Sequence, residues 1–174
     1  MEKRSGNAVT VGNFDGFHLG HQSIVRNTLS VSRDKQLGSL LLTFTPNPRL
    51  FFNAEDQLIF SDDQKRFFLR SSGIENIVNI DFSEVFRLDG REFIDKYLLE
   101  KYRMSCLVVG DNFGLGKGRE WDINRIAAYG NEKGFEVRIV PSEFLNGVKI
   151  SSSFIRGLLR NGEVALANKM MGRS

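Results

Sequence analysis

Short apolar runs alternate with longer amphipathic segments along this chain. The apolar runs cover residues 8–12, 39–45, 76–81, 106–110 and 136–141, and most of them end at Gly, Pro or Asp. They are rich in Val, Ile and Leu and nearly continuous, rather than alternating between apolar and polar positions. This pattern predicts buried strands of a parallel sheet that is covered on both faces.

The segments between the apolar runs carry the periodicity and the capping residues of helices. Candidate N-caps are Ser61 with Gln64 three residues on, Asp89, Asp122, and Ser152 or Ser153, before a last short helix at 163–170. Strands that alternate with helices predict right-handed crossovers and an α/β fold: a Rossmann-like, doubly wound parallel sheet of about five strands. Ligands of such sheets bind beyond the carboxyl ends of the strands.

Length and composition fit one folded domain over residues 1–174. The single cysteine, Cys106, fits a reducing compartment. No apolar signal segment follows Met1 and no run is long enough to cross a membrane, so we expect a cytoplasmic protein without a membrane partner. The net charge of +3 comes without a cluster of basic and aromatic residues, which does not indicate nucleic-acid binding but suits an enzyme that handles phosphates.

The segment from Gly12 to His21 follows the first apolar run and opens the first helix. It reads Gly-Asn-Phe-Asp-Gly-Phe-His-Leu-Gly-His. Its glycines permit a tight turn and a close approach of phosphate to the backbone, and a helix N-terminus attracts anions. His18 and His21 are three residues apart, so we expect them to lie on one helical face and to donate hydrogen bonds to phosphate oxygens.

Other interpretations of this segment remain open. The two histidines, which are the only ones in the chain, could share a metal ion with Asp15, or could be two unrelated core imidazoles. The glycines could simply shape a turn. The spacing matches neither a Walker A loop nor the dinucleotide-binding fingerprint of dehydrogenases.

A second group of polar residues lies late in the chain. Ser151, Ser152 and Ser153 place hydroxyl groups at a predicted helix start, and Arg156 follows about one turn later with a guanidinium suited to bidentate phosphate binding. The alternative is a well-capped helix with an exposed arginine. Together with the two histidines, this group predicts a triphosphate site that is closed from two sides.

Residues 43–49 read Thr-Phe-Thr-Pro-Asn-Pro-Arg and follow the second apolar run. Pro46 and Pro48 predict an extended loop in which Arg49 meets a phosphate and Phe44 or Phe52 meets an aromatic ring. A rigid loop with ordinary apolar packing is the alternative.

Residues 110–119 follow the fourth apolar run and contain four glycines with Lys117 and Arg119. This composition predicts a flexible basic loop. Asn112 offers both a donor and an acceptor to a purine edge or a phosphate. A solvated loop with a disordered tip is the alternative.

These four segments together resemble the adenylyltransferase module of the bacterial bifunctional riboflavin kinase/FAD synthetases. The shared motifs are Gly-x-Phe-Asp-Gly-x-His-x-Gly-His at 12–21, Thr-Phe-x-Pro-x-Pro-Arg at 43–49, Gly-Asp-Asn-Phe-x-x-Gly-Lys at 110–117 and Ile-Ser-Ser-Ser-x-Ile-Arg at 150–156. Order and spacing agree over nearly the whole chain, including residues 167–173. The first motif is shared by a wide superfamily of HxGH nucleotidyltransferases, and the set of four is far more specific.

The resemblance implies transfer of AMP from ATP to FMN, with Mg²⁺ bound mainly through substrate phosphates and water. His18 and His21 would hold the α- to γ-phosphates, and the serines with Arg156 the β- and γ-phosphates. Asn112 and the turn at 13–15 would lie near the adenosine and the α-phosphate, and the loops at 46–49 and 112–119 would border the flavin. The expected site is therefore His18, His21, Asn112 and Arg156 for catalysis; Gly12, Asn13, Phe14, Asp15, Gly20, Ser152 and Ser153 for ATP; and Phe44, Pro46, Asn47, Pro48, Arg49 and Phe113 for the flavin.

Three positions depart from the family pattern. Asn47 stands where the family commonly has His, Ser153 replaces a commoner Thr but keeps the hydroxyl, and Gly114-Leu115 replaces an Arg-Phe-like pair near the flavin. The sequence also stops where the family's β-barrel kinase module would begin. We therefore expect no riboflavin kinase domain within these residues, and such a domain is a potential partner.

Three other functional classes stay open at this point. The chain could be an HxGH enzyme that uses another phosphate acceptor, a non-catalytic module that binds nucleotide or flavin, or a structural domain. ATP-dependent release of pyrophosphate distinguishes an enzyme from the two non-catalytic classes, and the choice of acceptor distinguishes the two enzymes.

Overall fold

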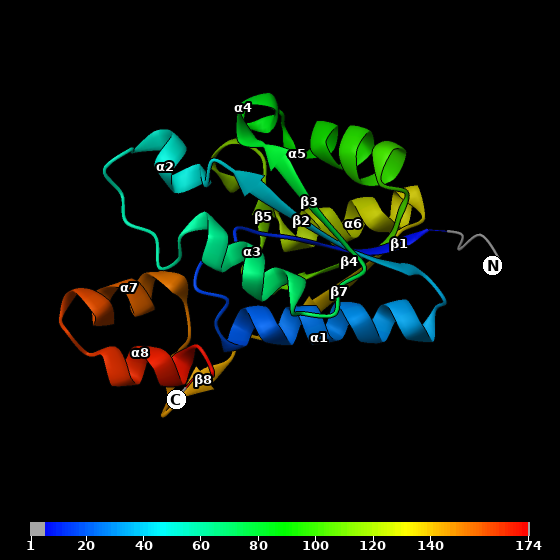
Figure 1. The fold of residues 1–174 in the computed structure, drawn as a ribbon. Helices are drawn as coiled ribbons and strands as arrows, with labels where there is room; N and C mark the ends of the chain where they lie inside the picture. Colours follow the sequence, from blue (N-terminus) through cyan, green and yellow to red (C-terminus); the bar gives the residue numbers. More distant parts are fainter. Residues whose placement is uncertain (1–5, 174) are drawn as a thin grey trace.

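The five apolar runs form the five strands of one parallel sheet in the computed structural model, which describes residues 6–173 (Figure 1). The strands are β1 (Asn7–Val11), β2 (Gly38–Thr45), β3 (Asn76–Asp81), β4 (Met104–Gly110) and β7 (Glu136–Val140). Their order is β3-β2-β1-β4-β7 and every neighbouring pair is parallel. The predicted doubly wound α/β fold is confirmed.

Helices cover both faces of this sheet (Figure 1). The long helices that follow the strands are α1 (Leu19–Asp34), α3 (Asp62–Arg70), α6 (Ile123–Lys133), α7 (Ser152–Arg160) and α8 (Val164–Met170). Shorter pieces are α2 (Pro48–Phe52), α4 (Phe82–Val85) and α5 (Gly90–Glu92), and the last of these continues as a π-helix, η1 (Phe93–Lys101). The predicted caps Ser61, Asp89 and Asp122 each accept a backbone N–H at the start of their helix.

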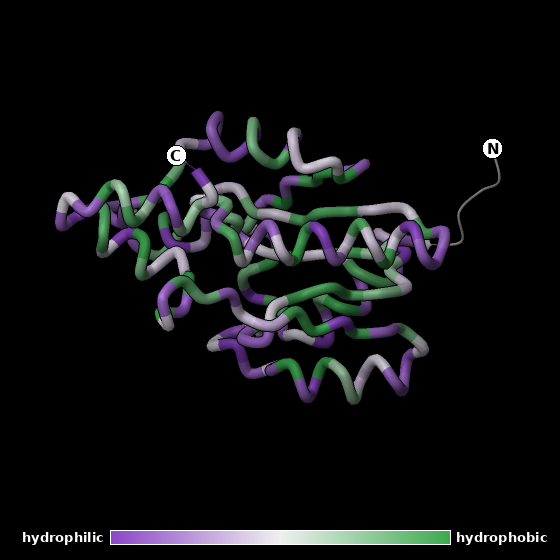
Figure 2. Tube along the Cα trace, turned by 90° about the horizontal axis from the view of Figure 1, so that it is seen from below, coloured by the Kyte–Doolittle hydropathy of each residue, from purple (hydrophilic) through white to green (hydrophobic). Residues whose placement is uncertain are grey.

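Successive residues of the central strands enter different hydrophobic clusters. Leu40 and Leu42 pack with buried side chains of α4, η1 and α6, whereas Leu41 packs with those of α1, α3, α7 and α8. Side chains alternate between the two faces of a strand, so this division places the helices in two layers. In Figure 2 the strands in the middle are mostly hydrophobic and the helices carry hydrophilic residues on their outer sides.

Two expectations about local structure were wrong at helix starts. The N-cap of α7 is Ser151, which accepts the N–H of Phe154, so Ser152 and Ser153 are the first helical residues rather than the caps. The extended loop expected at 46–49 is instead the start of α2. Pro48 occupies the first helical turn, where its fixed φ and missing N–H are compatible with a helix, and Asn47 caps it.

The prediction of a flexible basic loop at 110–119 was also wrong. The short strands β5 (Gly114–Leu115) and β6 (Trp121–Asp122) pair as an antiparallel hairpin. A 3₁₀ turn, η2 (Lys117–Arg119), connects them. The hairpin is ordered because the Leu115 and Trp121 side chains are buried in the same core.

A second hairpin joins β8 (Phe144–Leu145) to β9 (Val148–Lys149). Its turn residues, Asn146 and Gly147, both have positive φ. Asn-Gly is the two-residue turn that such a hairpin favours. Asn146-Gly147 is therefore a local sequence signal for this hairpin.

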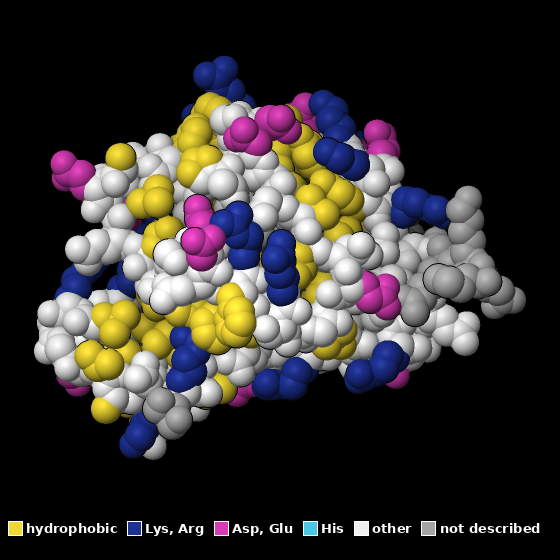
Figure 3. All heavy atoms as spheres, viewed as in Figure 1, with side chains coloured by type: hydrophobic (Ala, Val, Ile, Leu, Met, Phe, Trp, Pro, Cys, Tyr) yellow, Lys and Arg dark blue, Asp and Glu magenta, His cyan; other side chains and the backbone are white. Residues whose placement is uncertain are grey.

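Two surface properties concern possible partners. On the face seen in Figure 3, Lys and Arg side chains are scattered among acidic and hydrophobic ones. Among the helices between Gly6 and Arg173, none combines the length and the hydropathy needed to cross a bilayer.

The packing of the first hairpin gives a stability prediction. A Cβ atom at Gly90 would lie 2.3 Å from Cγ of the buried Trp121. We expect Gly90→Ala to lower the free energy of unfolding by about 1–3 kcal/mol, because overpacking forces the core to move. Denaturant unfolding measures this change.

Gly157→Ala is the matched control, because a Cβ there meets no atom within 4 Å and the residue lies inside α7. The control is expected to gain about 0.5–1 kcal/mol from helix propensity. An unchanged stability of Gly90→Ala would contradict the described packing of Trp121.

Candidate active site

A cavity of about 570 Å³ opens at the carboxyl ends of β1 and β4. These neighbouring strands lie at the switch point of the sheet, which is where ligands bind in doubly wound folds. Of the expected site residues, those that line it are Gly12, Asn13, Phe14, His18, Gly20, His21, Phe44, Pro48, Asn112, Phe113 and Ser152. The others, Asp15, Pro46, Asn47, Arg49, Ser153 and Arg156, are not part of this lining within the described residues.

The two histidines form a stacked pair at the start of α1. Their ring centroids are 3.7 Å apart and their planes differ by 17°. His18 is the N-cap of α1, and its Nδ1 accepts the N–H of His21 at 3.3 Å. A neutral His18 ring therefore carries its proton on Nε2, which leaves this N–H as the donor. The expectation that both rings share one face of the helix start is confirmed.

Burial keeps both imidazoles neutral at physiological pH. It lowers the pKa of His18 to about 4 and the pKa of His21 well below its usual value. Nδ1 of His21 is buried without a hydrogen-bond partner among residues 6–173. The pair is thus suited to donate hydrogen bonds to an anion.

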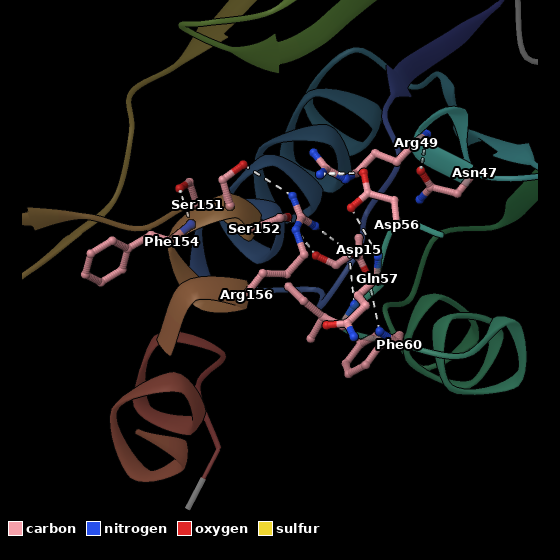
Figure 4. Close-up of polar contacts among 12 residues, drawn as sticks. Asp15, Asn47, Arg49, Asp56, Gln57, Phe60, Ser151, Ser152, Phe154 and Arg156 are labelled. Carbon is pink, nitrogen blue, oxygen red and sulfur yellow. Dashed lines mark hydrogen bonds and ion pairs between the residues drawn. The ribbon is translucent and has the colours of Figure 1, made fainter. Parts of the chain in front are cut away.

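Asp15 lies in the turn between β1 and α1, and its carboxylate points toward Arg156 and the backbone of Phe60 (Figure 4). It accepts the backbone N–H of Ile59 at 2.9 Å and that of Phe60 at 3.1 Å, and it forms an ion pair with Arg156 at 2.7 Å. The carboxylate is thus fully engaged inside the protein, so a metal ion shared by Asp15 and the two histidines is not favoured by this geometry.

Arg156 ties the start of α7 to the same turn (Figure 4). Its side chain is 8% exposed, and Nη2 donates to Oγ of Ser153 at 3.2 Å. Oγ of Ser152 donates to the backbone carbonyl of Asp15 at 2.9 Å. The alternative of an exposed arginine on a capped helix was therefore wrong. The N-termini of α1 and α7 are held together at one cavity, and both favour an anion there.

Arg49 is also paired rather than free. It forms an ion pair with Asp56 at 2.6 Å, and its backbone N–H is accepted by Oδ1 of Asn47 at 3.0 Å (Figure 4). The hydrogen bond from Arg49 lowers the pKa of Asp56. Burial, followed by the charge of Arg49, lowers the pKa of Arg156. Two arginines and two aspartates therefore form one charge network behind the cavity.

Sequence reasoning missed two members of this region. Asp56 comes from a polar segment without a recognisable motif, and Lys65 from the face of an ordinary amphipathic helix. The buried Lys65 donates from Nζ to the carbonyl of Phe44 at 3.2 Å, and burial lowers its pKa. Lys65 thus supports the end of β2, and Asp56 supports the start of α2. No local signal identifies them, because their partners lie 7 and 21 residues away along the chain.

The far side of the cavity is aromatic. Its lining includes Phe44, Phe82, Phe86, Phe93 and Phe113. Phe44 meets Phe82 edge to face, with centroids 5.5 Å apart. Such a wall offers ring faces and edges to a flat aromatic ligand. Phe52, the other expected aromatic contact, is 71% exposed and is not part of the lining.

The loops after β4 and β7 close a third side. Oδ2 and Oδ1 of Asp111 accept the backbone N–H and the hydroxyl of Ser142, at 2.9 and 2.7 Å, and Lys149 lies 3.6 Å from the same carboxylate. The carbonyl of Asn112 accepts a hydrogen bond from Arg119. Asn112 therefore sits at the cavity in the turn between β4 and the hairpin, and its carbonyl is bound by Arg119 of that hairpin.

Comparison with protein families matches residues 1–154 to the model described as FAD synthetase. Among curated proteins, the bifunctional riboflavin kinase/FMN adenylyltransferase of Buchnera aphidicola subsp. Schizaphis graminum is 32% identical over 173 residues, which is 97% of this chain and 55% of that protein. The protein of the same name from Escherichia coli K12 is 31% identical, with the same coverage. The chain thus spans about half the length of the curated relatives it matches.

Among solved structures, a crystal structure described as a macrolide-efflux protein from Streptococcus pneumoniae is similar with a TM-score of 0.80. It is 27% identical, and the match covers 98% of this chain and 58% of that one. This likeness supports the fold and the placement of the strands around the cavity.

The buried imidazoles give a pH prediction. Between the usual histidine pKa and about pH 4, His18 is protonated in the unfolded chain but neutral in the folded protein. This residue therefore lowers the free energy of unfolding as pH falls through that window. The loss from His18 amounts to about 3 kcal/mol when complete. Proton NMR of the two histidines measures their titration, and denaturant unfolding from pH 7 to 4 measures the stability.

His18→Asn is the control, because Asn also caps a helix but does not titrate there. It is expected to make the fall in stability between pH 6.5 and 4 shallower. A His18 signal that titrates near 6.5 in the folded protein would contradict the described burial.

Proposed function

The chain belongs to the FAD synthetase family, and from that premise we propose that it transfers the adenylyl group of ATP to FMN, giving FAD and pyrophosphate. The observation that carries the proposal is the single cavity with two unlike ends. At one end, the N-termini of α1 and α7 meet the stacked pair His18 and His21. At the other end lies the aromatic wall around Phe44 and Phe113.

The triphosphate of ATP would occupy the first end. Nε2–H of His18 and the ring of His21 would donate hydrogen bonds to the phosphates, and the free N–H groups at both helix starts would add to them. Ser152 lines the cavity and is oriented by its bond to Asp15. Ser153 and Arg156 are bonded to each other outside the lining, so their direct contact with the β- and γ-phosphates would require the Arg156 side chain to change partners.

FMN would place its ring system against the aromatic wall and its phosphate toward the histidines. Phe44, Phe82 and Phe113 offer the ring contacts, and Pro48 borders the same space. Pro46, Asn47 and Arg49 would support this side indirectly, because Asn47 caps α2 and Arg49 pairs with Asp56.

The reaction needs no nucleophile from the protein. A phosphate oxygen of FMN would attack the α-phosphorus of ATP in line, a new P–O bond would form, and the bond from that phosphorus to the bridging oxygen of the β-phosphate would break. Pyrophosphate leaves with that oxygen. The protein contributes positioning and hydrogen-bond donors for the charge that develops.

The proposed reaction would draw on Mg²⁺, which would supply neutralisation of the phosphate charge. Between Gly6 and Arg173, no three His, Cys, Asp or Glu side chains gather into a group able to hold a metal ion. The available donors fit an ion held mostly by phosphate oxygens and water, as Mg²⁺ commonly is. The cavity's own carboxylates, Asp111 and Glu143, lie on the loops after β4 and β7.

An acceptor panel tests the function directly. The protein would be incubated with ATP and Mg²⁺ and with FMN, riboflavin, nicotinamide mononucleotide or phosphopantetheine, and pyrophosphate release would be followed. Release with FMN alone, with FAD as product, is the expected result. Release with another acceptor would replace FMN in the proposal, and no release with any of them would refute an adenylyltransferase.

The stacked pair gives a sharper prediction. We expect His21→Ala to lower kcat by at least about tenfold, because it removes a donor placed for the transition state. Arg26→Ala, an exposed change on the same helix, is the control and should leave kcat unchanged. Circular dichroism checks the fold of both variants, and an undiminished kcat in a folded His21→Ala would remove His21 from the proposed machinery.

A further inference from the structure

The turn that delivers the two histidines has an unfavourable backbone. Phe14, Gly16 and Phe17 have φ values of 51°, 81° and 40°. For side chains other than glycine this left-handed region is costly, and such a conformation persists only where surrounding contacts impose it. The contacts that impose it therefore control where His18 lies.

One set of contacts comes from Asp15, which accepts the N–H groups of Ile59 and Phe60 and pairs with Arg156. The other comes from the last described segment of the chain. Nη2 of Arg173 donates to the carbonyl of Gly16 at 3.3 Å, and Nε2 of Gln22 donates both to the carbonyl of Phe17 at 2.9 Å and to that of Met171 at 3.0 Å. Two successive carbonyls of the turn, those of Gly16 and Phe17, are thus held by side chains other than Asp15.

The Arg173 guanidinium is itself fixed in place. It lies 3.9 Å from the ring centroid of Phe68 and 4.6 Å from that of Phe60, both close enough for cation–π attraction. Phe60 and Phe68 stack with their centroids 5.0 Å apart, and Phe17 of the turn stacks on Phe68 at 6.5 Å. The turn, α3 and the segment 171–173 therefore form one packed unit.

Close packing leaves little freedom for this segment to shift. A Cβ at Gly172 would lie 2.9 Å from Leu19, the first residue of α1. Residue 18 caps that helix and stacks on His21. A displacement of the turn would consequently move both imidazoles. Neither Gln22 nor Arg173 lines the cavity, so their effect is exerted through the turn.

We propose that Gln22 and Arg173 are positioning residues that hold the turn at 14–17, and with it His18 and His21, in the geometry needed for adenylyl transfer. The proposal rests on the proposed function for its catalytic consequence. It predicts that residues from far along the chain set the efficiency of the phosphate-binding end without contacting a substrate.

Arg173→Ala and Gln22→Met test the proposal with two readouts. Met keeps the shape of Gln22 without its donor. We expect each variant to shift the NMR signals of both histidines and to lower kcat by about tenfold or more, since small misplacements of reacting groups have large effects. The KM for FMN should stay nearly unchanged, because the aromatic wall is not disturbed.

Two matched variants separate positioning from general stability. Arg173→Lys retains a cation over the two rings and one donor, so it should recover part of kcat and move the histidine signals less. Arg160→Ala, an exposed arginine at the end of α7, should match the unaltered protein in both readouts. A lower melting temperature in Arg173→Ala and Gln22→Met, with unchanged histidine signals and kcat, would overturn the proposal.

The positioning role of Gln22 and Arg173 can be tested even if the proposed function fails. If the unaltered protein forms no FAD, adenylyl transfer fails, and the positioning role is judged from the histidine signals and from the affinity for inorganic pyrophosphate measured by calorimetry. Weaker pyrophosphate binding with shifted signals in both variants supports it. Unchanged binding and signals contradict it.

Discussion

The buried ion pair between Asp15 and Arg156 is the interaction on which the site depends. These residues are 141 positions apart and come from the first and last thirds of the chain. Their side chains are only 5% and 8% exposed, so each charge needs the other. The backbone N–H groups of Ile59 and Phe60 satisfy the remaining capacity of the carboxylate. Together with the hydrogen bond from Ser152 to the carbonyl of Asp15, this pair joins the starts of α1 and α7.

The pair also determines what the cavity presents to a ligand. The ion pair engages the charged side chains of Asp15 and Arg156 with each other. The phosphate end of the cavity is therefore left with neutral donors: the imidazoles, the hydroxyl of Ser152 and the helix N-termini. The phosphate end therefore favours an anion through neutral donors, while the cations in the lining, Arg119 and Lys149, contact the carbonyl of Asn112 and the carboxylate of Asp111. The aromatic half of the same cavity offers mainly ring faces and edges, so the two ends favour chemically different parts of the substrates.

Sequence patterns predicted the framework because strand burial and helix capping are local. The five apolar runs became the five strands within one or two residues, and Ser61, Asp89 and Asp122 cap helices as expected. The motifs around His18 and Ser152 were likewise predicted to close one site from two sides, since each opens a helix whose N-terminus attracts an anion. Local signals sufficed for these features.

Features that depend on distant partners could not be predicted in the same way. Arg156 has the positive charge expected of a residue that binds phosphate. Its actual partner, Asp15, is 141 positions away and is identified only by the folded structure. The segment 114–122 has the composition of a loop, and burial of Trp121 orders it. Arg173 reads as an ordinary terminal arginine until its contacts with Phe60 and Phe68 are known.

The most direct test of the central claim is a double-mutant cycle on ATP affinity, measured by calorimetry for Asp15→Asn, Arg156→Gln and the variant with both changes. If the ion pair aligns the two helix starts as one unit, each single change weakens ATP binding and the double variant is weakened little further, which gives a coupling energy of about 1 kcal/mol or more. Losses that add in the double variant would show that the two residues act independently, and would contradict the account.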